Sequence, residues 1–264
     1  IQSWDMDYFD PENSRSIHPN LMQRQALRQI SRYRLMGVKK ALVVAATGSG
    51  KTYLAAFDAL NFQAKKILFV VHKDMILGKA LETFAAVFGK TKTYGIYTGE
   101  SKELDADFLF ASNQILARHL ELFAPDEFDY IVVDEVHHAT ASTYKKIISY
   151  FKPQFLLGLT ATPDRMDEQS VYDLFDKNVP YDLRLRDALE NDLIVPFHYF
   201  GIKDSLIDYE DDVTQEGIRR IVMACSSQDN CKYIAEQIEK HKQSGGKLKC
   251  VAFCRNIEHC RLMA

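Results

Sequence analysis

A short segment rich in glycine and hydroxyl side chains, residues 45–52, carries the residue types that bind phosphate. Gly48 and Gly50 allow the backbone to turn tightly enough for successive N–H groups to point at phosphate oxygens. Lys51 supplies a cation, and Thr52 supplies a hydroxyl that can ligate Mg²⁺. A turn with a solvated lysine is the simpler interpretation, but an apolar run precedes the segment and a helical pattern follows it, which favours a phosphate loop. The expected phosphate-binding residues are Thr47, Gly48, Ser49, Gly50, Lys51 and Thr52.

Two adjacent carboxylates, Asp134 and Glu135, follow another apolar run at residues 128–133. The carboxyl ends of parallel strands share one edge of a sheet, so Asp134 can face the phosphate loop although it lies far along the chain. Asp134 can then hold Mg²⁺, and Glu135 can orient and deprotonate the water that attacks a γ-phosphate. Taken alone, the pair is equally typical of an acidic helix N-terminus. Beside a phosphate loop we favour catalysis, with Lys51 completing the catalytic set.

Short apolar runs alternate with helical stretches between residues 41 and 159. The expected strands are residues 41–44, 66–71, 93–97, 107–111, 130–133 and 155–159. Residues 74–88 predict a helix that Gly89 ends. Such alternation predicts an α/β fold, in which a parallel sheet is covered by helices on both faces. Further along, residues 228–242 predict an amphipathic helix and residues 249–253 another strand.

Several motifs, taken in their order along the chain, resemble those of superfamily 2 helicases of the DEAD/DEAH-box type. Asp134-Glu135-Val136-His137 resembles their motif II, and residues 157–165 resemble their motif III. The phosphate loop has the form that this superfamily uses. Residues 19–27 resemble the upstream adenine-reading segment, with Gln23 at the position of its glutamine. The resemblance implies a RecA-like P-loop fold, ATP and Mg²⁺ as cofactors, and adenine recognition by Gln23.

The resemblance also implies contacts with nucleic acid at successive strand ends. Residues 69–73 resemble motif Ia, and residues 110–114 resemble a later segment that touches the nucleic-acid backbone. Polar side chains there can donate to phosphates without reading sequence. Each alone is an ordinary loop residue, and their ordered recurrence is what favours the group. The expected nucleic-acid residues are His72, Lys73, Thr98, Ser112, Asn113 and Gln114. The expected couplers between nucleotide and nucleic acid are His137, Thr160 and Thr162.

Residues 134–139, 157–165 and 193–201 together resemble bacterial helicase-like proteins related to the motor (res) subunits of type III restriction enzymes. This resemblance implies ATP hydrolysis that drives movement on DNA or its remodelling, in restriction, defence or repair. A nuclease domain or subunit is the partner that such a motor would serve. A translocase that moves along duplex DNA without separating its strands remains open. So does a nucleotide-gated DNA-binding module that hydrolyses little ATP.

Residues 251–264 resemble motif IV, the opening strand and helix of a second RecA-like domain. We expect an N-terminal arm at residues 1–18, a first RecA-like ATP-binding domain at residues 19–190, a connector at residues 191–246 and the beginning of the second domain at residues 247–264. The start at Ile1 and the lack of later motifs lead us to expect a fragment with low activity of its own.

Composition limits the partners and the compartment. The net charge is −3, so no overall basic field points to nucleic acid, and any contact with DNA must be a local groove. No apolar run approaches the roughly twenty residues that cross a membrane, so we expect a cytoplasmic protein without a membrane partner. The five cysteines include no Cys-x-x-Cys pair, which favours free thiols over zinc or an iron–sulfur cluster.

Overall fold

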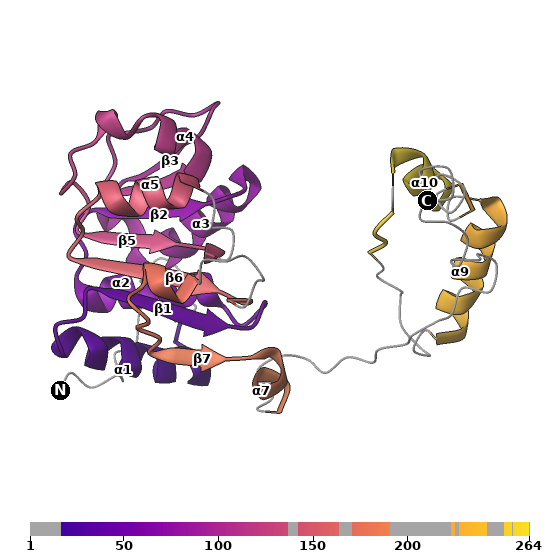
Figure 1. Cartoon of the computed structure of the whole chain (residues 1–264), viewed down its shortest axis with the longest axis horizontal. Coiled ribbons are helices and arrows are strands. Elements are labelled where there is room, and N and C mark those ends of the chain that lie inside the picture. Colours follow the sequence, from indigo (N-terminus) through magenta and orange to yellow (C-terminus); the bar gives the residue numbers. More distant parts are fainter. Residues whose placement is uncertain are drawn as a thin grey trace. The chain divides into compact units, whose positions relative to one another are not determined.

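A computed structural model describes residues 17–136, 142–163, 171–190, 223–224, 227–241, 251–254 and 256–263. The chain divides into two compact units, Ile1–Pro196 and Phe197–Ala264, each of which is described by itself (Figure 1). Most of the expected N-terminal arm and of the expected connector lies outside the described residues, as does His137. The expected division into arm, first domain, connector and second domain stays a prediction.

In the described part of the first unit, seven strands form one parallel sheet (Figure 1). The strands are β1 (Lys40–Ala45), β2 (Ile67–Val71), β3 (Tyr94–Tyr97), β4 (Phe108–Ser112), β5 (Tyr130–Val133), β6 (Phe155–Thr160) and β7 (Tyr181–Leu183). Their order across the sheet is β3-β4-β2-β5-β6-β1-β7, and each neighbouring pair is parallel. All the strands therefore end at the same edge, which brings the loops after β1, β2, β5 and β6 together.

Helices cover both faces of the sheet (Figure 1). The helices on one face are α1 (Leu21–Leu35), α2 (Lys51–Phe62) and α3 (Leu77–Phe88), and those on the other are α4 (Asn113–Arg118), α5 (Ser142–Tyr150) and α6 (Val171–Leu174). Alternate strand residues supply the two apolar cores, because successive side chains of a strand point to opposite faces. In β1, for example, Val43 packs with the first set of helices, whereas Leu42 and Val44 pack with the second.

A buried polar network ties the first helical layer to the sheet at the amino ends of the strands. Asp58 of α2 is fully buried and accepts two hydrogen bonds from the Arg34 guanidinium of α1, at 2.5 and 2.9 Å. The Tyr130 hydroxyl of β5 donates to the same carboxylate at 2.6 Å. Burial and the charge of Asp58 hold the pKa of Tyr130 well above its usual value, so this hydroxyl keeps its proton. Because every partner is satisfied, the buried charges are tolerated.

The expected elements of the first unit are confirmed, with small differences. All six expected strands are present, and their ends differ from the expected ones by at most one residue. The expected helix at residues 74–88 begins as a 3₁₀ turn, Asp74–Ile76, which continues as α3 and ends at Gly89. β7 and the short helix α7 (Leu185–Glu190) were not predicted. β7 is three residues long, too short for a recognisable pattern.

In the second unit, the expected helix at residues 228–242 is present as α9 (Gln228–His241). A further helix, α10 (Ile257–Met263), comes after residues 251–254, which are not helical. The expected strand at residues 249–253 is wrong for residues 251–253, which lie in no strand. A strand exists through pairing with a neighbour, and the described residues of this unit contain no other strand. Cys231, Cys254 and Cys260 are free thiols.

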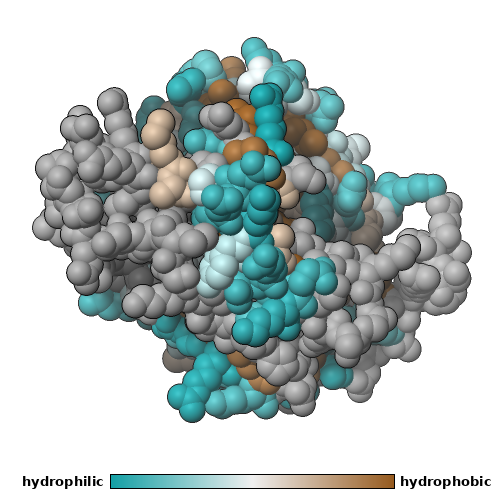
Figure 2. Space-filling view, turned by 90° about the vertical axis from the view of Figure 1, so that its right-hand side faces the viewer, coloured by the Kyte–Doolittle hydropathy of each residue, from teal (hydrophilic) through white to brown (hydrophobic). Residues whose placement is uncertain are grey.

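On the face shown in Figure 2, most of the described residues are hydrophilic, with hydrophobic patches between them. None of the described helices has both the length and the apolar character needed to span a membrane.

Candidate functional site

The loop between β1 and α2 has the backbone geometry of a phosphate cradle. Gly48 and Gly50 have φ angles of 83° and 85°, in the left-handed region that residues with a Cβ rarely adopt. Ser49 closes the turn, since its N–H and its hydroxyl both donate to the Ala46 carbonyl, at 3.2 and 2.7 Å. Helix α2 begins at Lys51, so its first N–H groups and the positive end of its dipole face the loop. An anion is the partner that this arrangement favours.

The Lys51 side chain lies within this loop. It is buried, and its Nζ donates to the Ala45 carbonyl at 3.2 Å. An ammonium group has three donors, so this single contact leaves Lys51 able to bind a phosphate oxygen placed in the cradle.

Gln23 contacts the phosphate loop directly. Its Nε2 donates to the Gly50 carbonyl at 3.0 Å. Its Oε1 accepts the Asn20 N–H and the Asn20 side chain accepts the Gln23 N–H, both at 2.8 Å, which makes a capping box at the start of α1. A Cβ at Gly50 would lie 2.7 Å from Gln23 Nε2, so the close approach itself needs glycine. The structure thus joins Gln23 to the loop, and its contact with adenine stays a prediction.

Asp134 and Glu135 follow β5, at the edge of the sheet where the phosphate loop follows β1. The Asp134 side chain accepts the Glu135 N–H at 2.9 Å, and the residue is only 6% exposed. Burial, with the negative charge of Glu135 added to it, raises the pKa of Asp134 to about 6, although that hydrogen bond and Lys51 act in the opposite direction. Asp134 is therefore a carboxylate whose charge is costly where it stands, and a bound cation would remove that cost.

Glu135 has a strained backbone. Its φ angle is 51°, in the left-handed region, which costs a residue with a Cβ about 1–2 kcal/mol. Strain of this kind clusters at functional sites, where the surrounding structure maintains it.

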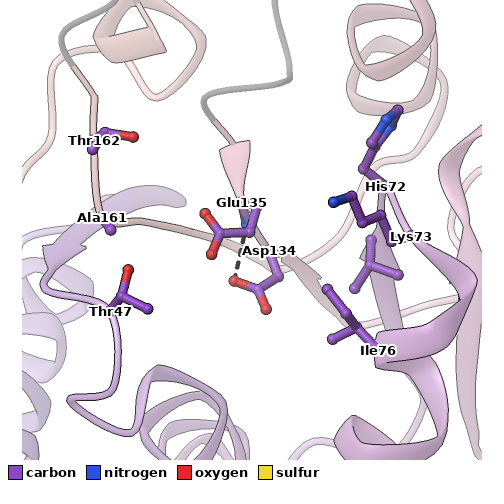
Figure 3. Close-up of a pocket in the computed structure, with 9 residues that line it drawn as sticks. Thr47, His72, Lys73, Ile76, Asp134, Glu135, Ala161 and Thr162 are labelled. Atoms are coloured by element: carbon purple, nitrogen blue, oxygen red, sulfur yellow. Dashed lines mark hydrogen bonds between the residues drawn. The ribbon is translucent and has the colours of Figure 1, made fainter. Parts of the chain in front are cut away.

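A cavity of about 380 Å³ connects these carboxylates with the neighbouring strand ends (Figure 3). It is lined by Thr47, Val71, His72, Lys73, Ile76, Asp134, Glu135, Ala161 and Thr162. In Figure 3 the carboxylates of Asp134 and Glu135 lie centrally, with Thr47 and Thr162 on one side, while the Lys73 side chain extends toward them from the other. The cavity thus brings together the phosphate loop, the end of β2, the pair after β5 and the end of β6.

The expected nucleic-acid residues differ in exposure. Lys73 and Gln114 are exposed and His72 is half-buried, so these three can reach a ligand outside the sheet edge.

Three other expected nucleic-acid residues are buried, namely Thr98, Ser112 and Asn113. The Thr98 hydroxyl accepts the N–H groups of Glu100 and Ser101, at 3.2 and 3.1 Å, which fixes the shape of that loop. Thr98 is therefore used within its own loop, and direct contact with phosphates is better suited to the exposed residues.

Thr160 and Thr162 lie at the end of β6, the strand beside β5. The Thr160 side chain is buried and accepts the Thr162 N–H at 3.2 Å, while Thr162 is exposed and lines the cavity. Their position beside the carboxylates suits a coupling role, which stays a prediction.

Tyr144 of α5 is a neighbour of the site that the sequence did not indicate. It is fully buried, and its hydroxyl has no hydrogen-bond partner among the described residues. Burial, and after it the charges of Asp134 and Glu135, hold the pKa of Tyr144 above its usual value, which places the side chain within electrostatic reach of both carboxylates. A tyrosine on an amphipathic helix carries no chemical pattern, so only the fold could identify it.

Known proteins similar to this chain include restriction-enzyme subunits and helicases. The family model described as "Type III restriction enzyme, res subunit" matches residues 16–165. The type I restriction enzyme EcoAI endonuclease subunit of Escherichia coli is 26% identical over 287 residues, which cover 97% of this chain and 35% of that protein. A protein of Saccharomyces cerevisiae (strain ATCC 204508 / S288c), assigned as the ATP-dependent helicase IRC3, is 29% identical over 163 residues, which cover 54% of this chain and 23% of that protein.

A solved structure has the same fold. It is a fragment of a protein from Vibrio vulnificus YJ016, assigned as an HsdR subunit of a type I restriction enzyme. The TM-score is 0.60 at 24% identity, and the match covers 100% of this chain and 47% of that one. The expected parallel α/β fold of the RecA-like kind is therefore confirmed. The chain spans 35% of the length of the Escherichia coli relative and 23% of the length of the Saccharomyces cerevisiae relative.

Proposed function

The chain belongs to the family of the type III restriction enzyme res subunit, and on that premise we propose that it is the motor part of a protein that hydrolyses ATP to move on DNA or remodel it. One observation carries the proposal. A single cavity is lined by the phosphate loop, by the Asp134–Glu135 pair and by the strand ends that resemble nucleic-acid segments. An event at the nucleotide can therefore reach the nucleic-acid side through residues in one small volume.

In this proposal the phosphate loop binds the β- and γ-phosphates of ATP. The first N–H groups of α2 and the turn around Gly48 and Gly50 donate to phosphate oxygens. Lys51 leaves the Ala45 carbonyl and binds the same oxygens, exchanging a neutral acceptor for a charged one. That exchange favours binding, because a phosphate oxygen adds the attraction of opposite charges to the hydrogen bond.

Mg²⁺ fits the oxygen donors that this site offers. Thr52 provides a hydroxyl and Asp134 a carboxylate, and Mg²⁺ in nucleotide sites uses one or two such protein ligands together with phosphates and water. The raised pKa of Asp134 supports the same role, since burial and the charge of Glu135 outweigh the Lys51 charge among the residues that the structure describes. The chemistry that the ion supplies when bound is neutralisation of charge on the phosphates.

Glu135 is the proposed general base. Its carboxylate shares the cavity with Asp134, so it can accept a proton from the water that attacks the γ-phosphate and orient that water in line. The left-handed backbone of Glu135 fixes where its side chain emerges from the strand end. The products are ADP and phosphate.

Gln23 is the proposed reader of adenine. Recognition of the base edge needs one donor and one acceptor from the amide. One N–H of Nε2 is used by Gly50 and one lone pair of Oε1 by Asn20, which leaves one donor and one acceptor for the base. Through the Gly50 contact, binding of adenine would also stabilise the phosphate loop.

Lys73 and Gln114, at the ends of neighbouring strands, are the proposed contacts with the DNA backbone. Lys73 also lines the cavity, and with His72, Thr160 and Thr162 it would relate DNA binding to the state of the nucleotide. We propose DNA as the nucleic acid on which the protein moves, because the Escherichia coli relative is named as an endonuclease subunit of a restriction enzyme. A nuclease domain or subunit is the corresponding proposed partner.

The test is release of phosphate from ATP by the full-length protein, with and without single-stranded DNA, duplex DNA and RNA. We expect turnover that requires Mg²⁺ and that DNA stimulates. Glu135→Gln should lower this turnover by about 100-fold or more. The matched control is Glu190→Gln, which changes an exposed glutamate paired with Arg186 and should leave turnover intact. Stimulation by RNA alone, or full turnover by Glu135→Gln, would contradict the proposal.

A further inference from the structure

Tyr144 combines two properties that seldom occur together. The side chain is fully buried, and its hydroxyl has no hydrogen-bond partner among the residues that the structure describes. Burying a hydroxyl without a partner is unfavourable, whereas phenylalanine would fill the same space without that cost. A buried hydroxyl of this kind needs an explanation, and a partner acquired in another state of the protein is one that the surroundings can test.

The surroundings of Tyr144 indicate which group that partner is. Tyr144 packs in the same apolar core as Val133 and Val136, the residues that flank Asp134 and Glu135. Among the residues that the structure describes, the charges of these two carboxylates raise the pKa of Tyr144, and Asp134 acts on it more strongly than Glu135 does. A carboxylate has about four acceptor positions. The Glu135 N–H uses one position of Asp134, so further acceptor positions remain for a second donor and for a cation.

We propose that Tyr144 is a positioning residue for the metal ligand Asp134, to which its hydroxyl donates a hydrogen bond when nucleotide and Mg²⁺ are bound. The inference rests on the proposed function, because it takes Asp134 as the ligand of Mg²⁺. Carboxylates that bind metals are held in place by such outer hydrogen bonds, and loss of one typically lowers metal affinity about 10- to 100-fold. Tyr144 thereby connects α5, on one face of the sheet, with the nucleotide site at its edge.

Tyr144→Phe tests this without changing the packing volume, and Tyr150→Phe is its matched control on the same helix. The Tyr150 hydroxyl already donates to the Phe123 carbonyl at 2.6 Å. In the protein without nucleotide, Tyr150→Phe should therefore lower the melting temperature, whereas Tyr144→Phe should leave it unchanged or raise it. A lower melting temperature for Tyr144→Phe would show that its hydroxyl already has a structural partner, and would overturn the proposal.

The second measurement is the affinity for a fluorescent ADP analogue, titrated with Mg²⁺ in the full-length protein. We expect Tyr144→Phe to require a Mg²⁺ concentration at least about tenfold higher than the wild type to reach half of the metal-dependent increase in affinity. Its affinity for the ADP analogue in EDTA should be unchanged. Tyr150→Phe should match the wild type. An unchanged Mg²⁺ requirement in Tyr144→Phe would overturn the inference alone. Failure of the wild-type protein to bind the nucleotide at all would instead contradict the proposed function.

Discussion

Replacement of Asp134 by asparagine should make the nucleotide-free protein more stable, although it removes a proposed ligand of Mg²⁺. Asparagine keeps the oxygen that accepts the Glu135 N–H, and it removes the buried charge. The size of the effect follows from the pKa of Asp134, which lies at about 6 in place of 3.8. A shift of about two units corresponds to roughly 3 kcal/mol.

The sign of this effect depends on pH. Because the pKa of Asp134 is raised in the folded protein, its contribution to stability is fully present below pH 3.8 and is lost as the pH rises through about 6. Asp134→Asn should therefore differ little from the wild type near pH 4 and be more stable by up to about 3 kcal/mol at pH 8. For a unit of this size that is a rise in melting temperature of roughly 6–12 °C.

The assay is thermal unfolding in EDTA between pH 4 and 8, followed by the same series with Mg²⁺ and ADP. We expect Mg·ADP to stabilise the wild type and to leave Asp134→Asn nearly unaffected. Asp105→Asn, which changes an exposed aspartate, serves as the control and should show neither effect. If Asp134→Asn melts at or below the wild-type temperature at pH 8, the charge of Asp134 is not costly and the reasoning fails.

Four further substitutions test separate parts of the account. Lys51→Ala should weaken binding of Mg·ATP by roughly 10- to 100-fold, the value of a hydrogen bond to a charged group, and equal affinities in calorimetric titration would reject its role. Glu135→Gln should keep ATP binding and lower turnover by about 100-fold or more, so near-normal phosphate release would place the base elsewhere. Lys73→Ala should reduce the slope of log affinity for DNA against log salt by about one, and an unaltered slope would exclude a phosphate contact. Asp58→Ala should lower the free energy of unfolding by about 3–5 kcal/mol in denaturant titration, because Arg34 would lose its buried partner, and a loss under 1 kcal/mol would show that the pair is dispensable.

The strands around the site could be predicted from sequence because each is a continuous apolar run followed by polar residues. Parallel strands buried on both faces need such runs, so the pattern of β2, β4 and β5 identifies their ends to within one residue. β7 could not be found this way, because it is not a continuous apolar run: of its three residues one is buried, one is half-buried and one is exposed. Its place in the sheet comes from its pairing with β1, which is a tertiary contact.

The residue types of the candidate site could also be predicted, but their energetics could not. A glycine-rich loop and a later pair of carboxylates can each be recognised from a short stretch of sequence. The raised pKa of Asp134 depends on its burial and on a neighbouring charge, which only the folded chain defines. The same is true of Tyr144, and of the hydrogen bond by which Gln23 joins α1 to the phosphate loop.

The most direct test of the motor itself is displacement of a third DNA strand from a triplex by the full-length protein. A protein that moves along duplex DNA removes that strand without needing to separate the duplex. We predict displacement that requires hydrolysable ATP and that is lost in Glu135→Gln, whereas Glu190→Gln retains it. Equal displacement with a non-hydrolysable ATP analogue, or DNA-stimulated ATP hydrolysis without displacement of the third strand or unwinding of a duplex, would contradict a motor that moves on DNA.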